Sequence, residues 1–198
     1  MSLTQTAKRD ELTYTSENRG VGTLKIRPAL DTDDGAIANV HLRTWQESYV
    51  GQLSQEFLDG LQIEEWNAQW RNRFSRINEW PCPDILVLEN EEGLVVGMAA
   101  VGACRDTGAT AMVGELQAIY LRSEYSGRGW GRELQDVCFK RLRELGYSCA
   151  TLWVLDSNTR ARNFYEKSGW KSDGAQKEDQ IGDQTVTELR YSIDLGED

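Results

Sequence analysis

A glycine-rich loop constrains this chain more than any other feature of its sequence. It runs Tyr125-Ser126-Gly127-Arg128-Gly129-Trp130-Gly131-Arg132. Its alternating glycines let the backbone approach a ligand closely, and the helix expected to follow begins with N–H groups that have no intrahelical acceptor. Such a loop suits an anion, and a diphosphate in particular. A dinucleotide fingerprint would need glycine at position 132, and a Walker loop would need Lys and Ser or Thr after its last glycine.

The segments around the loop predict a strand before it and an amphipathic helix after it. Residues 115–121 are the expected strand. Apolar residues then recur at helical spacing from Leu134 to Leu145, and Gly146 is the expected end of the helix. A further strand over residues 151–155 leads to a second motif at 158–170, Asn-Thr-Arg-Ala-Arg-Asn-Phe-Tyr-Glu-Lys-Ser-Gly-Trp.

The rest of the chain alternates between strand and helix patterns. Asp31 or Asp33 can cap a helix that ends at Gly51. Two helical pieces follow near residues 54–61 and 64–78, and the remaining strands are expected at 23–29, 84–89, 94–104, 170–176 and 185–194. This order predicts a mixed α/β (α+β) fold, a three-layer α/β/α sandwich around a mixed, mostly antiparallel sheet. Residues 1–22 are expected to be a flexible extension, and 23–198 a single domain.

The two motifs, in this order, resemble those of the GNAT superfamily of acetyl-CoA-dependent N-acetyltransferases. One hallmark is an Arg/Gln-x-x-Gly-x-Gly/Ala loop, and Ser126 stands here at the position of the usual Arg or Gln. The other is an Asn-x-x-Ala-x-x-Phe-Tyr-x-x-x-Gly-Phe helix, in which Trp170 replaces the last Phe. The resemblance spans about residues 24–195. A fainter one, to bacterial spermidine/spermine acetyltransferases, rests on residues 41–51 and on the hairpin around 182–184.

Composition narrows the class of partner and the compartment. The formal net charge of −10 disfavours nucleic acid and anionic membranes as partners, and mildly favours a cationic acceptor. An acidic balance is also common in proteins simply for colloidal stability. The single histidine and four cysteines without metal-ligand spacing predict no metal site and reduced thiols, as in a cytoplasmic protein. No apolar run is long enough to cross a bilayer. The oligomeric state stays open, with a homodimer among the alternatives.

The resemblance implies how acetyl-CoA would bind. Backbone N–H groups from Gly127 to Arg132 would hold the pyrophosphate without a metal, helped by the helix dipole. Arg128 and Arg132 would supply the charge that Ser126 lacks, although solvated charges at a helix start are an equal alternative. The pantetheine arm would bond the backbone of the preceding strand and contact the second motif. The implied cofactor residues are Ile119, Tyr120, Leu121, Ser126, Gly127, Arg128, Gly129, Trp130, Gly131, Arg132, Asn158, Ala161 and Tyr165.

Glu115 and Tyr165 are the candidate catalytic residues. Strand alternation would place Glu115 on one face with Gln117, Ile119 and Leu121, six residues before Leu121, where many GNAT enzymes carry their base. The alternative is a glutamate in a salt bridge at a strand edge. The resemblance implies that Tyr165 would donate a hydrogen bond to the departing CoA thiolate. The alternative is a core tyrosine, just as Asn158 could be only a helix N-cap.

The acceptor side carries the weakest signal. Trp45, Ser48 and Tyr49 share a helix face with His41 and are the candidate substrate-binding residues, although such an aromatic stripe is more often core. His41 is expected to be structural. The resemblance therefore implies an N-acetyltransferase that moves an acetyl group from acetyl-CoA to a primary amine of a small molecule or peptide by direct attack. The rival is a non-catalytic acyl-CoA sensor or interaction module on the same fold.

Overall fold

The computed structural model describes residues 13–18, 22–76 and 84–196. Within them one mixed sheet has eight strands in the order β1-β2-β3-β4-β5-β6-β8-β7. All neighbouring strands pair antiparallel except β5 and β6, which are parallel. The strands are β1 (Tyr14–Asn18), β2 (Gly22–Pro28), β3 (Asp84–Glu89), β4 (Val95–Ala103), β5 (Val113–Leu121), β6 (Cys149–Leu155), β7 (Lys171–Ile181) and β8 (Gln184–Asp194).

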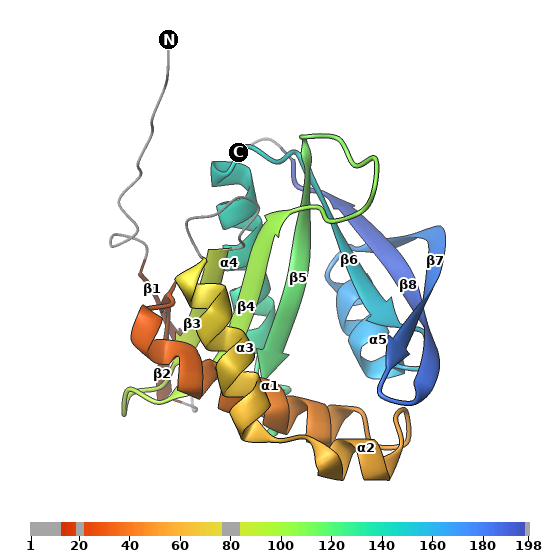
Figure 1. Ribbon diagram of the computed structural model, residues 1–198. Coiled ribbons are helices and arrows are strands. Elements are labelled where there is room, and N and C mark those ends of the chain that lie inside the picture. The colour runs from red at the N-terminus through yellow and green to blue at the C-terminus, as the bar shows by residue number, and fades with distance from the viewer. Residues whose placement is uncertain (1–12, 19–21, 77–83, 197–198) are drawn as a thin grey trace.

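Helices cover both faces of the sheet, which gives the expected three-layer α/β/α sandwich (Figure 1). On one face lie α1 (Asp34–Ser48) and α3 (Ile63–Ser75), with the short α2 (Gln55–Gly60) at the lower edge of the view. On the other face lie α4 (Trp130–Glu144) and α5 (Thr159–Lys167). Each layer buries one side of the sheet, so the hydrophobic core has two halves.

The two halves of the core follow from the apolar spacing of the helices. On α4, Leu134, Cys138 and Leu142 recur every four residues and are fully buried against the sheet. On the opposite face, Trp66, Trp70 and Phe74 of α3 have the same spacing and pack with Ile37 and the other apolar side chains of α1. The sheet is therefore buried on both sides at its centre.

The parallel strands β5 and β6 separate after a short pairing. Their register covers only Val113 to Glu115 on β5 and Cys149 to Thr151 on β6. Beyond this point they diverge, as Figure 1 shows, and α1 and α2 lie across the wide end of the gap. The cleft-side edge of β5 after Glu115 is thus left without a partner strand among the described residues, as the family resemblance implied.

A β-bulge in β5 overturns the expected side-chain alternation. Ala118 pairs with Ala100 but Leu116 pairs with Val101, so Gln117 is the extra residue. Leu116 and Ile119 consequently share the α4 face, whereas Ala118 faces α1 and α3. A side chain at Gly114 would also meet α4, through Leu142. Glu115 therefore lies on the opposite face, and the prediction that it shares a face with Ile119 and Leu121 is wrong.

Several boundaries differ from the expected ones. Strand β1 lies within the segment that was expected to be a flexible extension, while residues 1–12 and 19–21 are outside the described part of the chain. Helix α1 ends at Ser48 rather than at Gly51. The Asp33 carboxylate does not cap it, because its oxygens accept bonds from the Leu30 N–H and from Arg27. Three of the expected thiols are free, and Cys82 is outside the described residues.

Candidate active site

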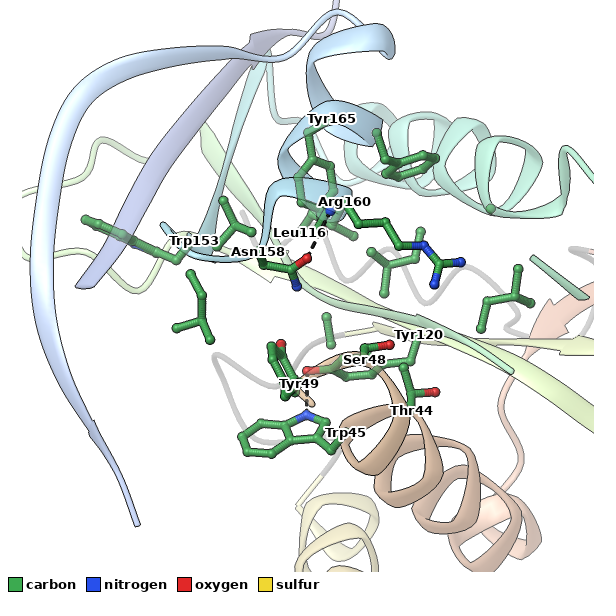
Figure 2. A pocket seen from close by; sticks show the side chains of 18 of the residues that line it. Thr44, Trp45, Ser48, Tyr49, Leu116, Tyr120, Trp153, Asn158, Arg160 and Tyr165 are labelled. Atoms are coloured by element: carbon green, nitrogen blue, oxygen red, sulfur yellow. Dashed lines mark hydrogen bonds between the residues drawn. The ribbon is translucent and has the colours of Figure 1, made fainter. Parts of the chain in front are cut away.

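A cleft of about 1170 Å³ opens where β5 and β6 separate. The glycine-rich loop and the start of α4 form one end of it, and α5 and β6 form one wall. The end of α1 forms the facing wall, with Tyr120 of β5 beside it (Figure 2). Both motifs and the aromatic stripe of α1 therefore meet in one cavity, although they are far apart in the sequence.

The glycine-rich loop has the backbone conformation that its glycines permit. Gly127 and Gly129 have φ angles of 74° and 92°, in the left-handed region. The Arg132 N–H donates to the Gly129 carbonyl over 2.9 Å and closes the first turn of α4. Helix geometry leaves the N–H groups of Trp130 and Gly131 without intrahelical acceptors. The loop thus presents backbone donors and the positive end of a 15-residue helix at the cleft.

Most of the expected loop residues line the cleft, and two do not. Ser126, Gly127, Gly129, Gly131 and Arg132 are part of its lining. The indole of Trp130 is fully buried in the core instead, and Arg128 lies on the exposed surface outside the lining. Any contact of Trp130 with a ligand is therefore limited to its backbone.

Two arginines bring positive charge to this end of the cleft. Arg132 lines it while donating to Asp136 over 3.2 Å on the next turn of α4. Arg160, in the first turn of α5, points along the cavity in Figure 2 and has no ion-pair partner among the described residues. Sequence analysis missed Arg160, although a basic residue two positions after Asn158 in the second motif was a usable signal.

The second motif presents Asn158, Ala161 and Tyr165 to the cleft from α5. The Asn158 side-chain oxygen accepts from the Ala161 N–H over 3.0 Å, so the N-cap alternative is realised. Its amide nitrogen is left toward the cavity (Figure 2). Burial raises the pKa of Tyr165, with smaller contributions from Tyr120 and Cys138. The Tyr165 hydroxyl therefore keeps its proton at neutral pH and is available as a donor.

Glu115 lies at the point where the strands separate and is 2% exposed. Its oxygens accept from the Arg105 backbone N–H (2.9 Å) and from the Arg105 guanidinium, with Nε at 3.0 and 3.1 Å. The ion pair that sequence analysis left as an alternative is thus present, and Arg105 is half exposed. Both residues also line the cleft, so the pair is part of the site.

The facing wall is formed by Trp45 and Ser48 of α1, by Tyr49 directly after it, and by Tyr120 of β5 (Figure 2). Burial raises the pKa of Tyr49, with smaller contributions from neighbouring tyrosines and from Glu188. Trp45 also packs on the α1 and α3 half of the core. The inner edge of the aromatic stripe therefore packs in the core, and its outer edge lines the cleft.

His41 is a partly buried residue whose ring packs behind this wall. Its ring stacks on Tyr120 at 4.2 Å between centroids, and its Nδ1 accepts from the Trp70 indole over 3.3 Å. The Nε2 atom has no hydrogen-bond partner among the described residues. Burial, aided by Arg73, lowers the pKa of His41 to about 3, so the ring is neutral at physiological pH.

Further cleft residues escaped the sequence analysis. Thr44 lies one turn before Ser48 on α1 and could have been found from helical spacing. Trp153 of β6, Lys177 of β7 and Glu188 of β8 also line the cleft. They meet through the pairing of β6 with β8 and of β8 with β7, in a register that no local pattern reveals.

Comparison with known proteins identifies the family. Residues 42–170 match the Acetyltransferase (GNAT) family, which is more than half of the chain. The chain is also 30% identical over 133 residues to the uncharacterized N-acetyltransferase YuaI of Bacillus subtilis, a match that covers 67% of this chain and 72% of YuaI. The protein therefore belongs to the GNAT family of acetyltransferases.

More distant relatives agree with this family. The chain is 23% identical to the spermidine N(1)-acetyltransferase of Thermoplasma acidophilum, over 85% of this chain and 98% of that protein. Among solved structures it resembles the PaiA N-acetyltransferase of the same organism in complex with coenzyme A. The TM-score is 0.65, with 22% identity over 85% of this chain and 99% of that one.

A second solved structure shares the fold. The yncA protein of Salmonella typhimurium, solved with its cofactor acetyl-CoA, has a TM-score of 0.64 and 19% identity, covering 88% of this chain and 95% of that one. At these identities the likeness of the structures concerns the fold alone.

Within the described part of the chain, no helix has both the length and the apolar character needed to span a membrane.

Proposed function

We propose that this protein transfers an acetyl group from acetyl-CoA to a primary amine by direct attack, without a covalent enzyme intermediate. The observation that carries the proposal is the single cleft that joins the glycine-rich loop, the unpaired edge of β5 and the Tyr165 hydroxyl. These features lie in the order in which a long thioester cofactor would need them, with diphosphate donors at one end and a hydroxyl donor farther along.

The cofactor end of the cleft suits a diphosphate. The N–H groups of Trp130 and Gly131, with the dipole of α4, would hold the pyrophosphate oxygens. Arg132 and Arg160 would supply the charge that Ser126 lacks, because both line this end. The unpaired backbone of residues 119–121 would exchange hydrogen bonds with the amide groups of the pantetheine arm. The arm would then lie along β5 as an added strand does.

Tyr165 would stabilise the leaving group. Reference pKa values of about 10 for tyrosine and about 8.5 for a thiol make full proton transfer unfavourable by about 2 kcal/mol. Because burial raises the pKa of Tyr165 further, a hydrogen bond to the developing thiolate is the favoured role. Bound acetyl-CoA supplies the reactive thioester, and the chain supplies this donor next to it.

Glu115 would receive the proton that the acceptor amine must lose. An alkyl ammonium with a pKa near 10.4 loses its proton at neutral pH at a cost of about 4–5 kcal/mol, so a carboxylate acting directly or through water helps. The Arg105 guanidinium opposes this role, since it stabilises the ionised carboxylate. Because Glu115 is only 2% exposed, Arg105 would stay beside the carboxylate, and a proton relayed through water is the route that keeps the pair together.

The test is an assay for the release of free CoA from acetyl-CoA in the presence of a panel of primary amines and of peptides with a free N-terminal amino group. The proposal expects at least one acceptor to give release that is saturable and depends on the protein. The second candidate function is a non-catalytic acyl-CoA sensor on the same fold. Tight acetyl-CoA binding with no CoA release for any acceptor would favour the sensor.

A further inference from the structure

The cleft already contains one bound ammonium group, which belongs to the chain itself. Lys177 of β7 places its Nζ 3.0 Å from Oε2 of Glu188 and 4.3 Å from the ring centroid of Trp153. Lys177 and Glu188 are direct cross-strand partners in the β7–β8 hairpin. A carboxylate and an aromatic face together form a favourable environment for an ammonium ion.

This ammonium site faces the cleft. Leu189 and Tyr191 of β8 point into the core half that contains α4, so Glu188, one residue before Leu189, lies on the opposite face. Glu188 pairs in register with Leu155, the last residue of β6, at the wide end of the separation from β5. Lys177, Glu188 and Trp153 all line the same cavity as Tyr165.

The aromatic side of the site is held in place by other residues. The Trp153 indole donates to Oδ1 of Asp106 over 2.9 Å, and Arg190 donates to Oδ2 of the same carboxylate over 2.7 Å. Arg190 also donates to Asp173 over 2.8 Å. Because this network does not involve Lys177 or Glu188, the indole would keep its orientation if the Lys177 amino group left.

Lys177 is the replaceable member of the site. Its side chain is 42% exposed, whereas that of Glu188 is only 17% exposed. The exposed lysine is held only weakly, so its amino group can leave the carboxylate when a ligand ammonium takes its place. A ligand ammonium in the same position would gain the same two contacts.

The reacting amine cannot be the group that binds there as a cation. An amine attacks a thioester only in its neutral form, whereas the Glu188 and Trp153 site favours the protonated form. An acceptor that uses both sites therefore carries two basic groups, one that is deprotonated and acetylated and one that stays charged.

We propose that Glu188 and Trp153 bind a second, non-reacting ammonium group of the acceptor, which takes the place of the Lys177 amino group. The acceptor class is then a diamine or longer basic amine rather than a simple monoamine. This inference rests on the proposed function of the cleft, since it deepens that function. Glu188 would be a specificity-determining residue and Lys177 a competitor for its site.

The test compares ligands of one chain length by calorimetry on protein saturated with CoA, which cannot donate an acetyl group. Butylamine, putrescine and γ-aminobutyrate present a methyl group, an ammonium and a carboxylate, respectively, at the far end. Putrescine should bind about tenfold more tightly than butylamine, and γ-aminobutyrate most weakly. Longer α,ω-diamines would locate the best spacing.

Two variants should act in opposite directions. Glu188→Gln should weaken putrescine binding about tenfold and remove its advantage over butylamine, whereas Lys177→Met should tighten it severalfold. Glu178→Gln and Lys171→Met remove the same charges at exposed positions of β7 and should leave the putrescine preference intact. If Glu188→Gln fails to fold, the tighter putrescine binding expected of Lys177→Met still tests the inference.

Equal binding of putrescine and butylamine by the wild-type protein, at every diamine length, would overturn the inference. So would weaker putrescine binding in Lys177→Met, because it would make Lys177 part of the binding surface. The proposed function fails in a different way, by absence of CoA release with all amines in the turnover assay. Binding and turnover thus separate the two failures.

Discussion

The indole Nε1 of Trp45 donates a hydrogen bond to the hydroxyl oxygen of Tyr120 over 3.2 Å and joins α1 to β5 beside the cleft. Because the Tyr120 oxygen accepts this bond, its own proton is directed elsewhere, and both side chains line the cavity. Burial raises the pKa of Tyr120, so the hydroxyl stays protonated at neutral pH. The shape of this wall of the cleft therefore depends on a contact between two residues that are 75 positions apart.

The first prediction concerns the energy of this contact. Trp45→Phe and Tyr120→Phe should each destabilise the protein, and the double variant should be about 1 kcal/mol more stable than the sum of the single effects predicts. Each single variant leaves one polar group of the pair without its partner, whereas the double variant removes both. Urea unfolding of the four proteins measures this coupling. Additive effects would mean that the hydrogen bond contributes nothing to stability.

Local patterns predicted most of the fold, because the spacing of apolar residues and the position of glycines indicate most elements within their own segments. The apolar spacing of α4, the stop at Gly146 and the alternation around the glycine-rich loop are of this kind. The bulge at Gln117 has no such signal, since neither glycine nor proline marks it. It changed the face of Glu115, and with it the expected neighbours of that carboxylate.

The cleft was only half predictable for the same reason. The end lined by the glycine-rich loop and α5 is built from two contiguous motifs, and these were found in the sequence. Its other end depends on strand register, which joins Trp153 to Arg190 of a distant segment and Lys177 to Glu188 across the β7–β8 hairpin. Such pairs depend on the register of the whole sheet, which one sequence does not reveal.

The second prediction tests the glycine-rich loop as the cofactor site. Gly129→Val should abolish most of the thermal stabilisation by acetyl-CoA, because it adds a side chain where the diphosphate must approach. Gly146→Val is the matched control. Gly146 has nearly the same φ angle (91° against 92°), lies at the other end of α4, and is not part of the cleft lining. Both variants should lose stability through backbone strain, and only Gly129→Val should lose the response to acetyl-CoA.

The third prediction separates the two roles of Glu115. If Glu115 receives the amine proton, Glu115→Gln should lower turnover about 10²–10⁴-fold at neutral pH, with partial recovery at high pH as the acceptor deprotonates on its own. If Glu115 serves only to pair with Arg105, the variant should lose stability with no pH-dependent defect in rate. Rate profiles between neutral and alkaline pH, together with urea unfolding, distinguish these outcomes.

The fourth prediction follows from the low pKa of His41, the only histidine in the chain. The unfolded ring takes up a proton near pH 6.5, whereas the folded ring does so only near pH 3. The unfolded state therefore binds more protons between these values, and stability must fall as the pH drops through this window. Between pH 7 and pH 5 the wild type should lose about 2 kcal/mol more than His41→Phe. Equal losses in urea unfolding would exclude a buried neutral His41.

The last prediction concerns Tyr165 and decides between enzyme and sensor. Tyr165→Phe removes one hydroxyl and keeps the ring packed beside Trp170, so CoA affinity should barely change. Turnover should fall by the equivalent of about 2–3 kcal/mol, because the lost donor acts mainly when charge develops on the leaving sulfur.

The size of this loss should also be the same at pH 7 and pH 9, since burial keeps the Tyr165 hydroxyl protonated across that range. Tyr147→Phe is the matched control, because Tyr147 is another buried tyrosine of the same core half but does not line the cleft. Loss of the Tyr147 hydroxyl should leave turnover unchanged. If Tyr165→Phe matched Tyr147→Phe in turnover, Tyr165 would be a packing residue, and the thiolate would have to be stabilised by another donor in the cleft.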